Sequence, residues 1–118
     1  MIAGTVEAEG LPVIYLPVAG RTWRATIDTG FNGDLELPPA VATAVNARFF
    51  AEGSAALAGG QRIQEDYYLV DFPFDGRTVR AVASFVAGSE ILIGTRLLRD
   101  YRLEIDFPAH EVKLDRTR

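Results

Sequence analysis

The sequence contains no cysteine and only one histidine, His110, among its 118 residues. A chain without cysteine cannot form disulfides or a cysteine-ligated zinc site, and one histidine is too few for a histidine metal cluster within one chain. Catalysis that relies on a positioned imidazole has a single candidate residue. We therefore expect no metal ion and no cofactor, so that any chemistry comes from carboxylates, hydroxyls and the backbone.

Positive charge and long apolar runs are also scarce. Lys and Arg number 12 against 16 Asp and Glu, and the pI is near 4.9. Nucleic-acid binding needs a basic surface that displaces counterions, so we expect no nucleic-acid partner. The apolar runs are far shorter than the roughly 20 residues of a membrane-spanning helix, and the N-terminus does not resemble a signal peptide. We expect no membrane partner and a cytoplasmic location.

The length and composition are those of one globular domain. Hydrophobic residues make up 48% of the chain and charged residues 24%, which is average for folded proteins. A chain of this length is one domain at typical domain sizes. We therefore treat residues 1–118 as a single domain with one core.

Most apolar residues recur with a period of two, which is typical of strands. The Asp75-Gly76 pair between two such segments is among the strongest short-range hairpin signals. The expected hairpins join 11–18 to 21–28, 65–74 to 77–86, and 102–107 to 111–115. We expect a mainly β fold.

Helical signals are short. Pro39 favours a helix over 39–47, because proline fits the first turn, and Thr95 is a candidate N-cap for 95–101. The glycine-rich segment 53–60 is expected to be a mobile loop or a hairpin tip. A weak internal similarity relates the strand and loop at 25–30 to those at 90–95, as in two copies of one strand–glycine–helix unit.

Asp28-Thr29-Gly30 is the strongest candidate for chemistry. An aspartate can act as acid or base, a threonine can donate a hydrogen bond that fixes the carboxylate, and a glycine allows close backbone approach. The segment follows apolar residues that would bury Asp28, and a buried carboxylate is costly without partners. An ordinary turn is the alternative, because Asp and Gly favour turns.

Three ordered blocks resemble the retropepsin-like aspartic proteases, the single-domain retroviral type and its prokaryotic relatives. The blocks are residues 25–33 followed by 35–38, the glycine-containing 57–60, and 91–98 followed by 103–107. Their order and spacing run from about residue 10 to 115. The resemblance implies a closed retropepsin-like acid-protease β-barrel with one or two short helices and one Asp-Thr-Gly loop per chain.

The resemblance also implies an activity and a partner. Aspartic proteolysis needs two carboxylates, so a homodimer would bring Asp28 of each chain to the two-fold axis to activate a water. Thr29 would bond across the axis, and Gly30 would offer its backbone to a peptide or protein substrate. The chain is thus expected to be a homodimeric aspartic endopeptidase.

The resemblance further suggests residues that contact the substrate, and a flap that folds over the bound peptide with Gly59 and Gly60 at its tip. The candidate substrate-binding residues are Phe31, Asn32, Leu57, Ala58, Gly59, Gly60, Ile91 and Ile93, with Leu35 as a further apolar wall. Core packing is the alternative for the apolar ones.

Three positions depart from the retroviral pattern: Phe31, Asn32 and Thr95. Retroviral members often carry a small residue at the first, and an Asp–Arg pair at the other two. A catalytically weak or inactive dimerisation or peptide-binding module is therefore an alternative function. A small β-barrel binding domain in which Asp-Thr-Gly is only a turn is a third. Asp106, Asp115 and His110 are expected to be exposed and uninvolved in catalysis.

Overall fold

Strands account for more than half of the chain, which confirms the expected mainly β fold. The computed structural model describes residues 1–118 apart from the side chain of Ala55. The elements are β1 (Ile2–Val6), β2 (Pro12–Val18), β3 (Arg21–Ile27), β4 (Leu35–Leu37), the 3₁₀ helix η1 (Pro39–Val41), β5 (Arg48–Ala56), β6 (Arg62–Phe74), β7 (Arg77–Phe85), β8 (Ile91–Ile93), β9 (Tyr101–Asp106) and β10 (Glu111–Arg116).

The three expected hairpins are present as the antiparallel pairs β2–β3, β6–β7 and β9–β10. In the first, Ala19 and Gly20 have φ values of 57° and 74°; in the second, Asp75 and Gly76 have 55° and 75°. Positive φ at both central residues is the two-residue turn whose twist matches that of the flanking strands. Short-range turn chemistry thus sets the register of both hairpins.

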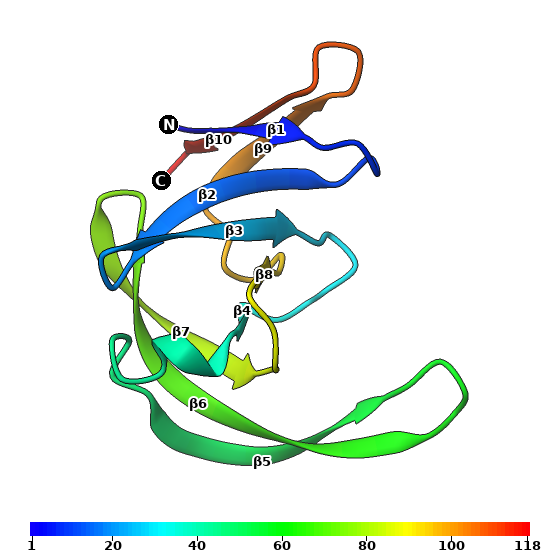
Figure 1. Ribbon diagram of the computed structural model, residues 1–118, viewed down its shortest axis with the longest axis vertical. Helices are drawn as coiled ribbons and strands as arrows, with labels where there is room; N and C mark the ends of the chain where they lie inside the picture. Colours follow the sequence, from blue (N-terminus) through cyan, green and yellow to red (C-terminus); the bar gives the residue numbers. More distant parts are fainter.

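All ten strands belong to one strongly curved sheet, in the order β5-β6-β7-β4-β8-β3-β2-β1-β10-β9 (Figure 1). Its two edges, β5 and β9, are not paired with each other, so the expected closure of the barrel is not confirmed. Figure 1 shows why the ends stay apart: the β5–β6 hairpin extends away from the body as a long arm, whereas β9 lies beside the termini at the opposite end.

The centre of the sheet places two loops side by side. β3 and β8 run parallel, with Ala25 opposite Ile91 and Ile27 opposite Ile93. The N–H of Asp28 then continues the ladder by donating to the Ile93 carbonyl over 2.9 Å. The two segments that resemble each other in sequence therefore end next to each other, and the loop after each strand emerges at the same place.

Of the two predicted helices, the first is much shorter than expected and the second does not form. Over 39–47, only Pro39–Val41 is helical, as a single 3₁₀ turn. Asn46 then adopts φ 53°. The N–H of Asn46 donates to Thr43 and that of Ala47 to Ala42, each over 3.1 Å, a pairing that ends helices with a left-handed residue.

Residues 95–100 form a run of turns, and Tyr101 begins β9. Leu98 donates its N–H to the Thr95 carbonyl over 3.1 Å, and Tyr101 donates to Leu98 over 2.8 Å. The Thr95 hydroxyl lies 3.4 Å from the carbonyl of Phe31, to which it donates, and makes no N-cap bond. The hydroxyl that was expected to cap a helix therefore bonds to the loop after β3 instead.

Two strands were not expected from the sequence. β1 pairs with β2 and β10, and β5 extends through Gly53 to Ala56. The glycine-rich segment is therefore a hairpin tip only beyond β5, where Leu57 donates its N–H to Gln61 over 2.7 Å. The strand assignment of 53–56 corrects the expected loop.

The core fills the inside of the curved sheet. Trp23 is 5% exposed and packs in the core, and its indole N–H donates to the Val18 carbonyl over 3.2 Å. The Arg21 guanidinium covers the outer face of the ring at 4.1 Å. Helices long and apolar enough to cross a membrane are absent from the described residues.

Candidate active site

Asp28 follows β3 directly and begins the tight loop of residues 28–34 that leads to β4, which we call the Asp28 loop. The side chain is half-buried, and its Oδ1 accepts a hydrogen bond of 2.9 Å from the Gly30 N–H. The Asp28 carbonyl accepts from the Phe31 N–H over 3.1 Å. The segment is therefore a turn, and that turn orients a carboxylate at the end of a buried strand.

The loop after β8 holds the Asp28 loop in place. Thr95 donates its N–H to the Phe31 carbonyl over 2.9 Å, Gly94 donates to Asp34 over 2.9 Å, and Arg96 donates to Gly33 over 3.2 Å. Three successive N–H groups thus bind one side of the Asp28 loop. The threonine that departs from the retroviral pattern serves here as a neutral brace within one chain.

Phe31 folds back over two glycines. A Cβ added to Gly33 would lie 2.7 Å from Cε1 of the Phe31 ring, and one added to Gly94 would lie 2.8 Å from its Cδ2. Neither position can hold a side chain while the ring stays there. The large residue after Asp-Thr-Gly is therefore accommodated by small residues on both loops.

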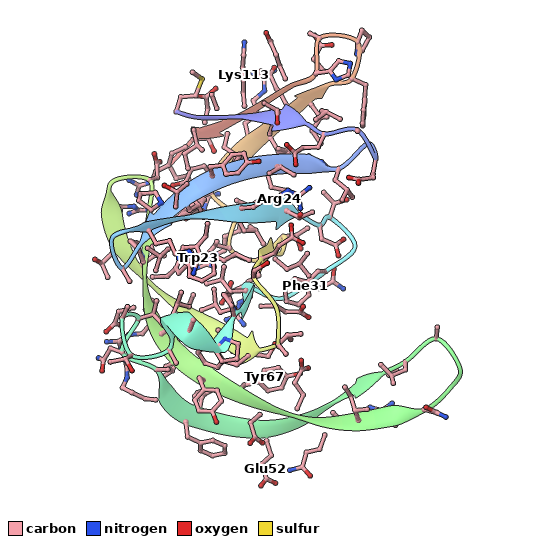
Figure 2. The ribbon with its side chains drawn as sticks, in the orientation of Figure 1. Trp23, Arg24, Phe31, Glu52, Tyr67 and Lys113 are labelled. Atoms are coloured by element: carbon pink, nitrogen blue, oxygen red, sulfur yellow. The ribbon has the colours of Figure 1, made fainter. Side chains whose placement is uncertain are left out.

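A cleft of about 430 Å³ separates this loop from the β5–β6 hairpin. Figure 2 shows Tyr67 projecting from β6 toward the side on which Phe31 lies, whereas Glu52 points away from the outer face of β5. The lining residues are Phe31, Asn32, Gly33, Asp34, Leu35, Phe50, Glu65, Tyr67, Val82, Ser84 and Arg96. The structure thus brings the predicted Phe31, Asn32 and Leu35 together in one concave site.

The other predicted substrate-binding residues lie elsewhere. Ile93 is fully buried in the core. Ile91 is 1% exposed and borders a second hollow of about 380 Å³, where half-buried Leu92 also lies. The predicted flap residues, 57–60, are exposed at the tip of the β5–β6 hairpin and do not line the cleft.

Sequence reasoning missed Asp34. It is 5% exposed, and its Oδ2 accepts a 2.9 Å hydrogen bond from the Val82 N–H of β7. Its Oδ1 is buried and, within the described residues, has no hydrogen-bond partner. An aspartate before a strand looks like a turn residue in sequence, and its burial depends on a strand almost fifty residues away.

Two glutamates near the loop were also missed. Glu36 lies in β4 opposite Leu92, and Glu65 lies on β6 at the cleft. Burial raises the pKa of the Glu36 carboxyl above its usual value, and the charges of Glu65 and Asp28 raise it further. The site therefore carries a concentration of negative charge.

This charge gives a pH-dependent prediction for Glu36→Gln. A carboxyl whose pKa is raised by folding stays protonated to higher pH in the folded chain than in the unfolded chain. The free energy of unfolding therefore falls as pH rises from the ordinary glutamate pKa of about 4.3 through the raised pKa of Glu36. We expect the variant to be more stable than wild type at pH 7 and equal to it near pH 3.5. Urea denaturation at each pH measures the free energy of unfolding, and Glu52→Gln, at an exposed position, is the matched control. If Glu36→Gln is no more stable than wild type at pH 7, this account is contradicted.

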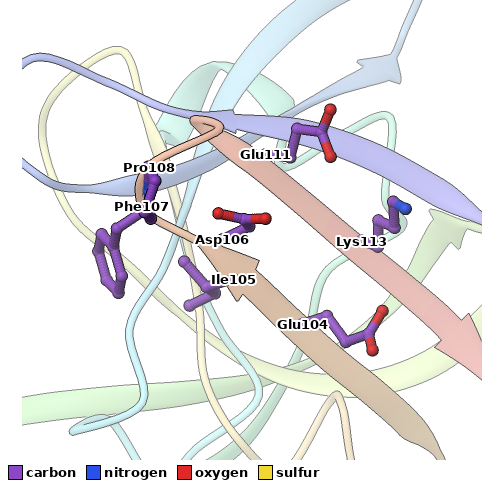
Figure 3. Close-up of a pocket in the computed structure, with 7 residues that line it drawn as sticks. All are labelled: Glu104, Ile105, Asp106, Phe107, Pro108, Glu111 and Lys113. Atoms are coloured by element: carbon purple, nitrogen blue, oxygen red, sulfur yellow. The ribbon is translucent and has the colours of Figure 1, made fainter.

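A further hollow, of about 500 Å³, lies on the β9–β10 hairpin and contains no residue of the Asp28 loop (Figure 3). Two of its carboxylates have local partners: Asp106 accepts from the Ala109 N–H over 3.1 Å, and Glu104 accepts from Arg102 over 2.8 Å. Asp106, Asp115 and His110 are exposed, as expected. No group of three His, Asp or Glu side chains suited to a metal ion occurs in the described part of the chain.

Comparison with solved structures identifies the fold. Over 96% of this chain and 88% of the other, it resembles a retropepsin-like aspartic protease from Rickettsia conorii, with a TM-score of 0.67 and 17% identity. The simian foamy virus (mac) protease matches with a TM-score of 0.57 and 21% identity over 74% of this chain and 91% of that one. The EIAV protease, solved with the inhibitor HBY-793, matches with a TM-score of 0.60 and 17% identity over 81% of this chain and 92% of that one.

No protein-family model matches the chain, and no curated protein matches its sequence. The likeness therefore lies in the fold, which is that of the retropepsin-like aspartic proteases, as the sequence blocks predicted.

Proposed function

We propose that this protein is a homodimeric aspartic endopeptidase. Two Asp28 carboxylates, one from each chain, would activate a water that hydrolyses a peptide bond. The observation that carries the proposal is the position of Asp28: a half-buried carboxylate at the end of β3, in a loop held by three backbone hydrogen bonds, on a retropepsin-like fold.

The chemistry requires two carboxylates that share one proton. The ionised one removes a proton from the water as it attacks the scissile carbonyl, while the protonated one donates to the carbonyl oxygen. Collapse of the tetrahedral intermediate breaks the C–N bond and transfers a proton to the leaving amine. One chain supplies a single Asp-Thr-Gly, so the second carboxylate would come from a two-fold-related partner. Thr29 would bond to the partner's loop.

The substrate would bind as an extended strand between the Asp28 loop and the β5–β6 hairpin. Recognition by added β-strand pairing uses the peptide backbone for affinity and pockets for specificity. The 57–60 tip of the hairpin would close over the peptide, and Gly30 would contact its backbone. The cleft lined by Phe31 and Asn32 would hold a side chain.

The proposal is tested by digesting a mixed peptide library between pH 4 and 7, at concentrations where sedimentation shows a dimer. We expect cleavage with an optimum on the acidic side of neutrality, because a carboxylate pair works only while it holds one proton. If a verified dimer binds peptides without cleaving any, the proposal fails and the peptide-binding module replaces it.

A further inference from the structure

We propose that the cleft between the Asp28 loop and the β5–β6 hairpin selects a lysine or arginine side chain of the bound peptide, with Asp34 and Glu65 as its carboxylate partners. This inference rests on the proposed function in one respect, namely that the ligand is a peptide. It adds a preference at one substrate position, which the fold does not dictate.

Asp34 supplies the first argument. The side chain is more than nine-tenths buried and lines the cleft. Only Oδ2 is satisfied, by the Val82 N–H, while Oδ1 has no partner within the described residues. A buried carboxylate oxygen without a donor is costly, and a cationic side chain entering the cleft would supply the donor with charge assistance.

Glu65 supplies a second carboxylate from the other side of the cleft. It lies on β6, is half-buried, and accepts a 3.1 Å hydrogen bond from the Tyr67 hydroxyl, which orients it. Its negative charge is one of the causes that raise the pKa of Glu36, so its field extends into the site. Carboxylates from two elements would face one bound cation.

The remaining walls suit the stem of a basic side chain. Phe31, Phe50 and Tyr67 are aromatic, and Leu35 and Val82 are aliphatic. Methylene groups of lysine or arginine pack on such surfaces while the charged head reaches polar groups, and aromatic faces attract cations.

Arg96 is the basic residue of the lining, and it is exposed. Among the described side chains it makes no ion pair with Asp34 or Glu65. Two carboxylates against one guanidinium leave the cleft with a net negative charge, which disfavours an acidic side chain. We expect Arg96→Gln to strengthen the preference for a basic residue.

Binding to a peptide array tests the inference separately from hydrolysis. Asp28→Asn protein is applied to immobilised decapeptides of mixed sequence, each made with Lys, Arg, norleucine or Glu at every position in turn. Norleucine keeps most of the lysine stem and lacks the ammonium group. We expect one position at which Lys or Arg binds about tenfold or more tighter than norleucine, and Glu weakest, because a hydrogen bond to a charged group is worth at least that factor.

The same array is probed with Glu65→Gln and Asp34→Asn added to this background. Asn at position 34 retains an acceptor for the Val82 N–H. If Asp34→Asn nevertheless does not fold, Glu65→Gln still tests the site. Each is expected to reduce the Lys-over-norleucine ratio, whereas Asp66→Asn, an equal charge change one residue along β6 and outside this cleft, leaves it unchanged.

Equal binding of Lys and norleucine, a preference for Glu, or a Lys preference that survives Glu65→Gln would overturn the inference, as would an array that binds nothing. Cleavage of the library by wild type in any of these cases would leave the proposed function standing. Selection of Lys without any cleavage would support the inference and contradict the proposed peptidase activity.

Discussion

Asp28→Asn is expected to reduce peptide cleavage by about 10²–10⁴-fold or more while leaving the fold intact, because a neutral amide cannot take a proton from the attacking water. Asparagine keeps an oxygen that accepts the 2.9 Å bond from the Gly30 N–H, so the turn survives the substitution. The measurement is the initial rate on one peptide from the library, with the dimer verified for both proteins.

Asp106→Asn is the matched control for this variant. It makes the same chemical change in an exposed turn of the β9–β10 hairpin and likewise keeps an acceptor for the Ala109 N–H. We expect its cleavage rate to equal that of wild type. If Asp28→Asn cleaves as fast as the control, Asp28 is a turn residue and the peptidase assignment is wrong.

Gly94→Ala is expected to destabilise the fold strongly, because the added methyl group has no room between the two loops. The new Cβ would lie 2.1 Å from the Gly33 carbonyl oxygen and 2.8 Å from the Phe31 ring. Because the nearest obstacle is backbone, relief requires the two loops to separate, which breaks the hydrogen bonds that fix Asp28. Overpacking of this kind costs about 1–3 kcal/mol, occasionally more, and cleavage is expected to fall with it.

Gly59→Ala is the control for this prediction. A Cβ at Gly59 meets nothing within 4 Å, and the residue has no positive φ. We expect its free energy of unfolding to stay within about 0.5 kcal/mol of wild type, as at an unstrained surface position. Thermal and urea denaturation of both variants provide the comparison. Equal stability of Gly94→Ala and Gly59→Ala would show that the two loops are not packed as described.

Features set by short stretches of sequence were predictable. The hairpin at Asp75-Gly76 follows from two residues that tolerate positive φ between alternating segments. The position of Asp28 at the end of an apolar strand was also visible, as was the family resemblance in three ordered blocks. The fold that the solved structures support agrees with that resemblance.

Features set by distant contacts were not predictable. Residues 53–56 of β5 were expected in a loop or hairpin tip because they include Gly53 and small residues. In the fold, the Tyr67 ring lies where a Cβ of Gly53 would be, at 2.1 Å from Cε2. The Thr95 hydroxyl, which was expected to cap a helix at 95–101, donates to the Phe31 carbonyl instead. Asp34 accepts its hydrogen bond from a strand almost fifty residues away, and Glu65 comes near the Asp28 loop only through the fold, so composition and periodicity could not reveal either residue.

The central claim, one active site shared by two chains, is tested most directly by mixing subunits. Wild type is held at a fixed concentration where it is dimeric, and Asp28→Asn protein is added until native mass spectrometry shows complete exchange. Random pairing in a two-fold dimer predicts that cleavage falls to about one half at equal amounts and about one tenth at ninefold excess. Cleavage unchanged at ninefold excess, with mixed dimers present, would show that each chain holds a complete site and would contradict the account.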